Sequence, residues 1–204
     1  MYEAINRMGN ALKSLGIKKG DRVFVFLPRV KELYIATLAI AKIGAIAGPL
    51  FSAFGPDALK DRLMDSEAKI LITNPALKDK IDGIRKELSE LEHVIVVGAD
   101  KKSLRKGELS YEELVASQSS ELECERMDIE DPLYLLYTSG TTGKPKGVVH
   151  VHGDIIGQHM TTKWVLDLRE DDIYWCTADP GWVTGTVYGI FGPLSNGASV
   201  VSYE

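Results

Sequence analysis

The chain has 204 residues, of which 45% are hydrophobic and 26% are charged, and its formal net charge is −5 at pH 7. This composition is typical of a globular α/β protein, and the negative charge argues against bulk electrostatic binding to nucleic acid or anionic lipid. No apolar run approaches the roughly 18–20 residues that span a bilayer, and the first residues lack the basic and apolar regions of a signal peptide. Because Cys124 and Cys176 form no C-x-x-C unit, we expect a reduced, cytoplasmic setting without nucleic-acid or membrane partners.

The first half of the chain alternates helical and extended patterns. Apolar residues keep helical spacing from Tyr2 to Leu15 and stop at Gly16, which predicts a helix. The same reasoning predicts strands at 21–27, 45–50, 69–73 and 93–97, and helices at 31–43, 57–67 (opened by Pro56) and 75–91. This βαβα order predicts an α/β fold with a mainly parallel sheet flanked by helices.

Residues 99–130 interrupt this pattern, because they are rich in Lys, Glu and Ser and contain one short helical pattern at 111–116. We interpret them as a solvated connection and not as a functional cluster of charges. The connection separates a first α/β portion, residues 1–98, from a second portion, residues 131–204.

A candidate polyphosphate site lies between two apolar runs, at 133–137 and 148–151. Residues 137–147 read Tyr-Thr-Ser-Gly-Thr-Thr-Gly-Lys-Pro-Lys-Gly. Glycine permits close approach to an anion, hydroxyls can donate to phosphate oxygens, and lysines supply cations. An ordinary hairpin turn needs only about two to five residues and not this density of donors. We therefore predict a phosphate-binding hairpin loop, with Thr138, Ser139, Gly140, Thr141, Thr142, Gly143, Lys144, Lys146 and Gly147 as its phosphate-binding residues.

Further elements are predicted after this loop. A helix extends from 153 or 154 to Trp164, with Ile155, Ile156, His159 and Met160 on its apolar side. Strands are expected at 173–176 and 198–202, with a helix at 183–191 between them.

The loop differs from the common phosphate-binding motifs. A Walker A loop requires Gly where this chain has Thr138, and Ser or Thr where it has Pro145, so a P-loop kinase or NTPase is disfavoured. The dinucleotide fingerprint also lacks its first glycine at 138. The run instead resembles, residue for residue, the signature of the adenylate-forming superfamily, which includes acyl-CoA synthetases, peptide-synthetase adenylation domains and luciferase-type enzymes.

A second stretch resembles the acetyl-CoA synthetase branch of this superfamily. Residues 172–185 read Asp-Ile-Tyr-Trp-Cys-Thr-Ala-Asp-Pro-Gly-Trp-Val-Thr-Gly. The resemblance implies ATP-dependent activation of acetate or another short carboxylate to acyl-AMP and then to acyl-CoA, with pyrophosphate and AMP released. ATP, Mg²⁺ and coenzyme A are the implied substrates and ion. A fatty-acid or amino-acid activating enzyme is the alternative within the superfamily.

The resemblance also implies roles for residues. The loop at 138–147 would hold the β- and γ-phosphates and offset charge on the departing pyrophosphate. Val183 and Thr184, supported by Trp182, would line the acyl pocket and the inner end of the pantetheine tunnel. Trp175 is expected to be a core aromatic residue. No metal ligand is assigned in this chain.

Two other groups of residues have ordinary interpretations. His150 and His152 lie on one predicted strand face as a possible metal pair, but a histidine that closes the hairpin is the preferred interpretation. Lys78 and Lys80 lie near the place where family members contact the phosphates of coenzyme A. Their spacing does not match that pattern, so a solvated helix face is the preferred interpretation.

Family members of this kind are several times longer than 204 residues. The resemblance therefore implies part of a large N-terminal domain, with the C-terminal domain absent. The alternatives are an inactive truncated fragment or one half of a split enzyme completed by a second chain. We expect the chain alone not to complete the reaction, and an unpaired sheet edge would favour self-association.

Overall fold

A computed structural model describes residues 1–138 and 143–203. Within these residues, a seven-stranded sheet has the order β5-β4-β3-β1-β2-β6-β7, and all neighbours are parallel except the antiparallel β6–β7 hairpin. A separate parallel pair joins β8 and β9. The strands are β1 Arg22–Val25, β2 Ile46–Pro49, β3 Ile70–Thr73, β4 His93–Val96, β5 Glu108–Ser110, β6 Pro132–Thr138, β7 Lys146–Val151, β8 Ile173–Tyr174 and β9 Ser199–Val200. The predicted mainly parallel sheet is confirmed.

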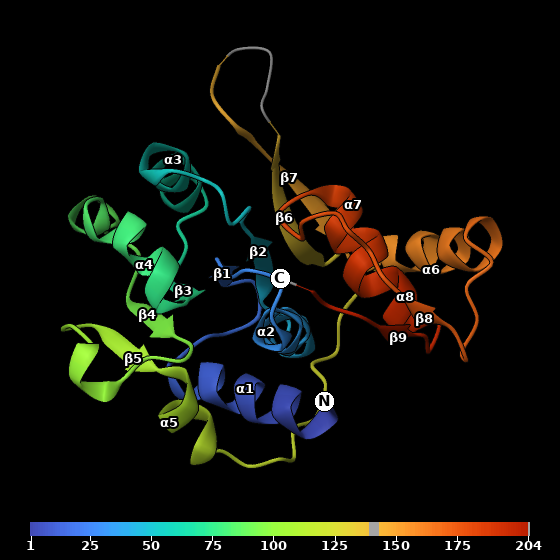
Figure 1. The fold of residues 1–204 in the computed structure, drawn as a ribbon, viewed down its shortest axis with the longest axis horizontal. Helices are drawn as coiled ribbons and strands as arrows, with labels where there is room; N and C mark the ends of the chain where they lie inside the picture. Colours follow the sequence, from blue (N-terminus) through green and yellow to red (C-terminus); the bar gives the residue numbers. More distant parts are fainter. Residues whose placement is uncertain (139–142, 204) are drawn as a thin grey trace.

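Helices cover both faces of the large sheet, because alternate strand side chains point to opposite faces. In β1, Val23 and Val25 are buried with residues of α1 and α2, whereas Phe24 is buried with residues of α3 and α4. Figure 1 shows α1 and α2 on one side of the sheet and α3 and α4 on the other. The helices are α1 Tyr2–Ser14, α2 Lys31–Lys42, α3 Pro56–Asp65, α4 Pro75–Asp82, α5 Tyr111–Ala116, α6 Asp154–Val165, α7 Val183–Thr186 and α8 Gly192–Ser195, with 3₁₀ turns at Arg85–Glu87 and Lys101–Ser103 and a π-helix at Val187–Phe191. No helix in the described part of the chain is long and apolar enough to cross a bilayer.

Two predictions about helices are wrong. The helix predicted at 75–91 ends at Asp82, because Gly83 follows and the chain then tightens into a 3₁₀ turn. In α6, Ile156 is exposed, and Gln158 and Thr162 are buried instead. Gln158 is accommodated because its Nε2 donates a hydrogen bond of 2.8 Å to Tyr134 Oη.

The connection at 99–130 is less solvated than predicted. It contributes the edge strand β5, and there Glu108 forms an ion pair of 2.7 Å with Lys78, with both side chains only 8% exposed. Lys78 also donates to the Ser103 carbonyl at 3.2 Å. The prediction that Lys78 lies on a solvated helix face is therefore wrong, because β5 covers that face. Lys80 is half-buried and donates to the Ser52 carbonyl at 3.0 Å.

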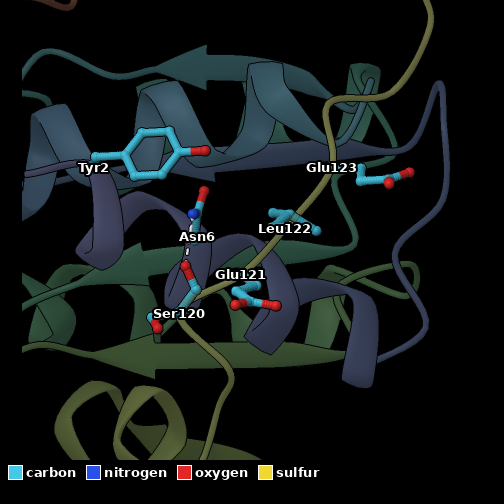
Figure 2. A pocket seen from close by; sticks show the side chains of 6 residues that line it. All are labelled: Tyr2, Asn6, Ser120, Glu121, Leu122 and Glu123. Atoms are coloured by element: carbon cyan, nitrogen blue, oxygen red, sulfur yellow. Dashed lines mark hydrogen bonds between the residues drawn. The ribbon is translucent and has the colours of Figure 1, made fainter.

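The connection after α5 is held against α1 by side-chain hydrogen bonds. Asn6 Nδ2 donates to the Ser120 carbonyl at 2.7 Å, and Asn10 Nδ2 donates to the Ser119 and Glu121 carbonyls at 2.9 Å. Figure 2 shows the hydrogen bond from Asn6 to Ser120. A pocket of 320 Å³ lies beside this bond. Glu121 and Glu123 line this cavity, and their negative charges argue against a phosphate ligand there.

The buried Lys78–Glu108 pair generates a test of stability. Replacing Glu108 by alanine leaves the Lys78 ammonium buried without its counterion, and the loss of one partner of a buried pair costs about 3–5 kcal/mol. We expect a loss of about this size in the free energy of unfolding, measured by urea denaturation. The matched control is Glu113→Ala, which breaks the exposed pair with Lys101 and should cost much less. Equal losses in the two variants would contradict a buried pair.

Candidate functional site

The candidate site lies at the carboxyl edge of the large sheet. Strands β1, β2 and β6 are parallel neighbours, so the segments that follow them leave the sheet at the same edge. These segments are residues 26–30, residues 50–55 and the segment that joins β6 and β7. In open α/β sheets, ligands bind at the carboxyl ends of the strands.

The predicted phosphate loop joins the antiparallel strands β6 and β7. Thr138 is paired with Lys146 across the two strands. Gly143 has φ +87°, a left-handed conformation that glycine adopts without strain. Thr138, Lys144 and Lys146 are exposed. The remaining predicted loop residues, Ser139, Gly140, Thr141 and Thr142, lie outside the described residues.

A buried arginine of α3 packs against the stem of this hairpin. Arg62 is 9% exposed, and its guanidinium carbon lies 4.2 Å from the ring centroid of Phe54 and 5.7 Å from that of Tyr137. Its Nη1 donates to the Ala58 carbonyl at 2.7 Å. Burial lowers the pKa of Arg62 through desolvation, but arginine remains protonated in proteins. A cation therefore contacts two aromatic rings, one of which belongs to the end of the hairpin stem next to the loop.

Tyr137 is also tied to α3 by its hydroxyl. Tyr137 Oη donates a hydrogen bond of 2.7 Å to Asp65 Oδ2. Burial and this bond to a carboxylate raise the pKa of Tyr137 above its usual value of 10.0, so the phenol keeps its proton. Tyr137 is paired with Gly147, where a Cβ would lie 3.4 Å from the tyrosine ring and 3.0 Å from Leu135 Cδ1. Gly147 therefore gives room chiefly to the side chain of Leu135 in the stem.

A second segment, residues 177–184, packs on the loop that follows β2. At Gly181, a Cβ would lie 2.2 Å from the Phe51 amide nitrogen, so only glycine fits. Ser52 Oγ donates to Asp179 Oδ2 at 3.2 Å, and the Gly181 amide donates to Asp179 Oδ1 at 2.8 Å. Arg29, which follows β1, donates to the Thr177 carbonyl at 2.6 Å. Segments that follow two different strands thus hold this loop at the carboxyl edge.

The predicted acyl-pocket residues follow this loop at the start of α7. The ring centroid of Trp182 lies 5.6 Å from that of Phe51 and 6.4 Å from that of Phe54. Val183 is 51% exposed, and Thr184 is also exposed. Trp182 therefore belongs to an aromatic cluster, and the two residues after it are accessible.

The prediction that Trp175 is a core residue is wrong. Trp175 is 53% exposed, and its ring makes an edge contact with the ring of Tyr203, at 6.5 Å between centroids. It follows the two-residue strand β8, which lies in the small sheet and outside the main core.

The two histidines near the end of β7 have structural interpretations. The His150 ring is stacked on Tyr134 at 4.4 Å between centroids, and His150 Nδ1 lies 3.0 Å from Asp154 Oδ2. Burial lowers the pKa of His152, which favours a neutral imidazole. Among the described residues, no group of three or more His, Cys, Asp or Glu side chains could hold a metal ion.

The arrangement connects the two predicted groups through residues that sequence reasoning missed. Contacts run from Trp182 to Phe54, from Phe54 to Arg62 and from Arg62 to Tyr137. One signal could have identified Arg62: with Leu59 and Leu63 it has the spacing of the buried face of α3. A charged residue at such a position is unusual without a partner. No comparable pattern marks Asp65 or Asp179.

Comparisons with known proteins agree with this fold. The family model described as AMP-binding enzyme matches residues 1–204. An acetyl-coenzyme A synthetase of Bacillus subtilis (strain 168) is 55% identical over 202 residues, which cover 98% of this chain and 35% of that protein. The acetyl-coenzyme A synthetase of Methanothrix thermoacetophila is 46% identical over 217 residues, which cover 100% of this chain and 33% of that protein.

Two solved structures have the same fold. The crystal structure of a Brucella canis acyl-CoA synthetase superimposes with a TM-score of 0.90 at 36% identity, over 98% of this chain and 36% of that one. The crystal structure of the anthranilate CoA ligase AuaEII in complex with anthranoyl-AMP superimposes with a TM-score of 0.90 at 33% identity, over 99% of this chain and 39% of that one. The chain thus spans about a third of the length of the relatives that it matches.

The half-buried carboxylate of Asp179 generates a test of pH dependence. Desolvation raises its pKa above the ordinary 3.8, although the Gly181 amide, Ser52 and Arg29 oppose the rise. The folded state therefore binds this proton more tightly than the unfolded state, and the wild type gains stability as pH falls toward 3.8. Asp179→Asn lacks this gain.

We expect the melting temperature of Asp179→Asn, relative to wild type, to be highest at neutral pH and to decline as pH is lowered. Thermal unfolding at a series of pH values measures the difference. Asp61→Asn, which changes an exposed carboxylate on α3, is the control for a general effect of charge. A difference that grows in favour of Asp179→Asn on acidification would contradict the raised pKa.

Proposed function

The chain belongs to the AMP-binding enzyme family, and on this basis we propose that it forms the phosphate- and acyl-binding part of an acid–thiol ligase. The reaction is the ATP-dependent activation of acetate or another short carboxylate to acyl-AMP and then to acyl-CoA. The names of the relatives support this reaction class. The acetyl-type sequence at 172–185 supports a short acid.

One observation carries the proposal. The stem of the hairpin, at Thr138 and Lys146, and the loop before Val183 lie at the same carboxyl edge of the sheet, linked through Phe54 and Arg62. An adenylating enzyme needs a phosphate site and a carboxylate site close together, because a carboxylate oxygen must reach the α-phosphorus of ATP.

The chemistry has two steps. A carboxylate oxygen attacks the α-phosphorus, the bond to the bridging oxygen of the β-phosphate breaks, and pyrophosphate leaves. The sulfur of coenzyme A, whose thiol proton is released, then attacks the acyl carbon. The bond between this carbon and the phosphate oxygen of AMP breaks, and AMP leaves with the electrons of that bond.

In this chain, Lys144 and Lys146 bring positive charge to the departing pyrophosphate, and the Thr138 hydroxyl donates a hydrogen bond to it. The other predicted donors of the loop, Ser139, Gly140, Thr141 and Thr142, complete the proposed phosphate site. Gly143 and Gly147 supply the conformation and the room that the hairpin requires.

The acyl group is proposed to lie against Val183 and Thr184, with Trp182 fixing their position. Trp182 is suited to this role because its ring packs against Phe51 and Phe54. Thr184 offers a hydroxyl at an accessible place, and Val183 offers an apolar surface of a size that suits a short acid.

ATP, coenzyme A and Mg²⁺ are the proposed substrates and ion. Exposed lysines and hydroxyls suit a polyphosphate, and Mg²⁺, when bound to it, would neutralise part of its charge. The proposal assigns Mg²⁺ no ligand among the described side chains. A reducing, cytoplasmic setting is part of the proposal, supported by the free thiols of Cys124 and Cys176.

The phosphate role is tested in a chimera in which this chain replaces the aligned residues of the Bacillus subtilis relative. Changing Lys144 and Lys146 together to alanine removes two cations from the proposed pyrophosphate site. Charge-assisted hydrogen bonds contribute about 1.5–3 kcal/mol each. We expect a loss in kcat/KM for ATP of at least about tenfold, with the KM for acetate unchanged.

The matched control changes Lys102 and Lys106, which are both exposed, to alanine. The net charge falls by the same amount, but both residues lie beside β5 at the opposite end of the sheet. If the two double variants have the same ATP kinetics, the loop is not the phosphate site.

The acyl role is tested by Val183→Phe in the same chimera. The larger ring should overlap a short acid and cost about 1–3 kcal/mol where the packing cannot relax. We expect a higher KM for acetate and an unchanged KM for ATP in the exchange of labelled pyrophosphate into ATP. Val165→Phe, at an exposed position of α6, is the control for a general effect of the added ring. Normal acetate kinetics in Val183→Phe would show that this side chain does not face the acid.

A further inference from the structure

Helix α3 holds the stem of the β6–β7 hairpin through two side chains that belong to neither predicted site. We propose that Arg62 and Asp65 are positioning residues for the phosphate-binding loop and act through Tyr137. This inference rests on the proposed function, because it takes the loop to bind phosphate.

Asp65 fixes the hydroxyl of Tyr137. It is an exposed residue at the last position of α3, and it accepts the hydrogen bond of 2.7 Å from Tyr137 Oη. A carboxylate acceptor makes this bond stronger than one between neutral groups. The ring of Tyr137 is otherwise buried, so this hydrogen bond fixes the position of the hydroxyl end of the ring.

Arg62 packs against the face of the same ring. A buried cation is costly unless it is well partnered, yet within the described residues Arg62 Nε is buried without a hydrogen-bond partner. The carbonyl of Ala58 and the rings of Phe54 and Tyr137 surround the guanidinium. Burial of the Arg62 guanidinium is therefore unfavourable for stability by itself. Its contacts nevertheless connect three segments, which are α3, the loop after β2 and strand β6.

The hairpin needs such an anchor. β6 is bridged to β2 at Tyr134, which lies three residues before Tyr137, and β7 is an edge strand on which Val148 and Val149 are exposed. Tyr137 and Gly147 form the pair next to Thr138 and Lys146. A shift of the tyrosine ring therefore moves the adjacent pair, which carries a hydroxyl and a cation of the proposed phosphate site.

The experiment is a double-mutant cycle in the full 204-residue chain. Tyr137→Phe removes only the hydroxyl, Asp65→Ala removes the acceptor, and Asp65→Asn keeps an acceptor oxygen without the charge. Asp61→Asn is the control, because it changes the charge on the same helix without a bond to Tyr137. Arg62→Met is a separate variant that keeps an unbranched apolar side chain and removes the cation.

Three quantities are measured for each variant. Amide hydrogen exchange of residues 146–151 without ligand reports the order of the hairpin stem, and the melting temperature reports global stability. Calorimetric titration with inorganic pyrophosphate reports the phosphate site. A role that is merely structural would change the melting temperature and would affect exchange throughout the sheet.

We expect Tyr137→Phe, Asp65→Ala and Arg62→Met to raise exchange at 146–151 and the Kd for pyrophosphate at least about threefold, with little change in melting temperature. The double variant of Tyr137 and Asp65 should be no worse than either single variant, because both remove one bond. Asp65→Asn should recover most of the affinity, and Asp61→Asn should match wild type.

The outcomes separate this inference from the proposed function. If wild type binds pyrophosphate and the Lys144 and Lys146 double variant does not, the phosphate site stands. Unchanged exchange and affinity in Tyr137→Phe and Asp65→Ala would then overturn the positioning role alone. Additive effects in the cycle would also overturn it. If wild type does not bind pyrophosphate, the phosphate site and the positioning role both fail.

Discussion

The candidate site depends on one constraint of parallel sheets, which is that adjacent strands end at the same edge. Strands β1, β2 and β6 are neighbours in the sheet, although β6 lies more than 80 residues after β2 in the chain. Their carboxyl ends bring together a loop that docks residues 177–184 and a hairpin that carries two lysines. Both faces of the sheet are covered by helices, so this edge is the place where polar side chains can reach a ligand without disturbing the core.

Aromatic and charged side chains connect the segments that meet at this edge. Trp182 packs with Phe54, Arg62 contacts Phe54 and Tyr137, and Tyr137 is bonded to Asp65. These contacts connect Val183 and Thr184, the proposed acyl-binding residues, to the proposed phosphate-binding hairpin through α3. Because a carboxylate and a polyphosphate must be held at a fixed separation for adenylation, rigid contacts between their two binding segments suit the proposed chemistry.

The sequence predicts the regular elements well because their signals are local. The stop of α1 before Gly16 and the stop of α2 before Gly44 follow from glycines with positive φ. Edge strand β5 was missed because it is three residues long and begins with the charged Glu108, which is buried only through its pair with Lys78. The buried face of α6 was misjudged for a similar reason, since Gln158 is satisfied by Tyr134 from a distant strand. The candidate loop was visible from its own residues, but Arg62 and Asp65 acquire their roles only through tertiary contacts.

The most direct measurement is the acetate-dependent exchange of labelled pyrophosphate into ATP by the chimera that carries this chain in place of the aligned residues of the Bacillus subtilis relative. The exchange requires the phosphate-binding hairpin and the acyl-binding residues to act together. It reports only the first step, which does not need coenzyme A. The account predicts exchange that depends on acetate and falls as the acid is lengthened. A folded chimera that shows no exchange with any short carboxylate, while the parent enzyme is active, would contradict it.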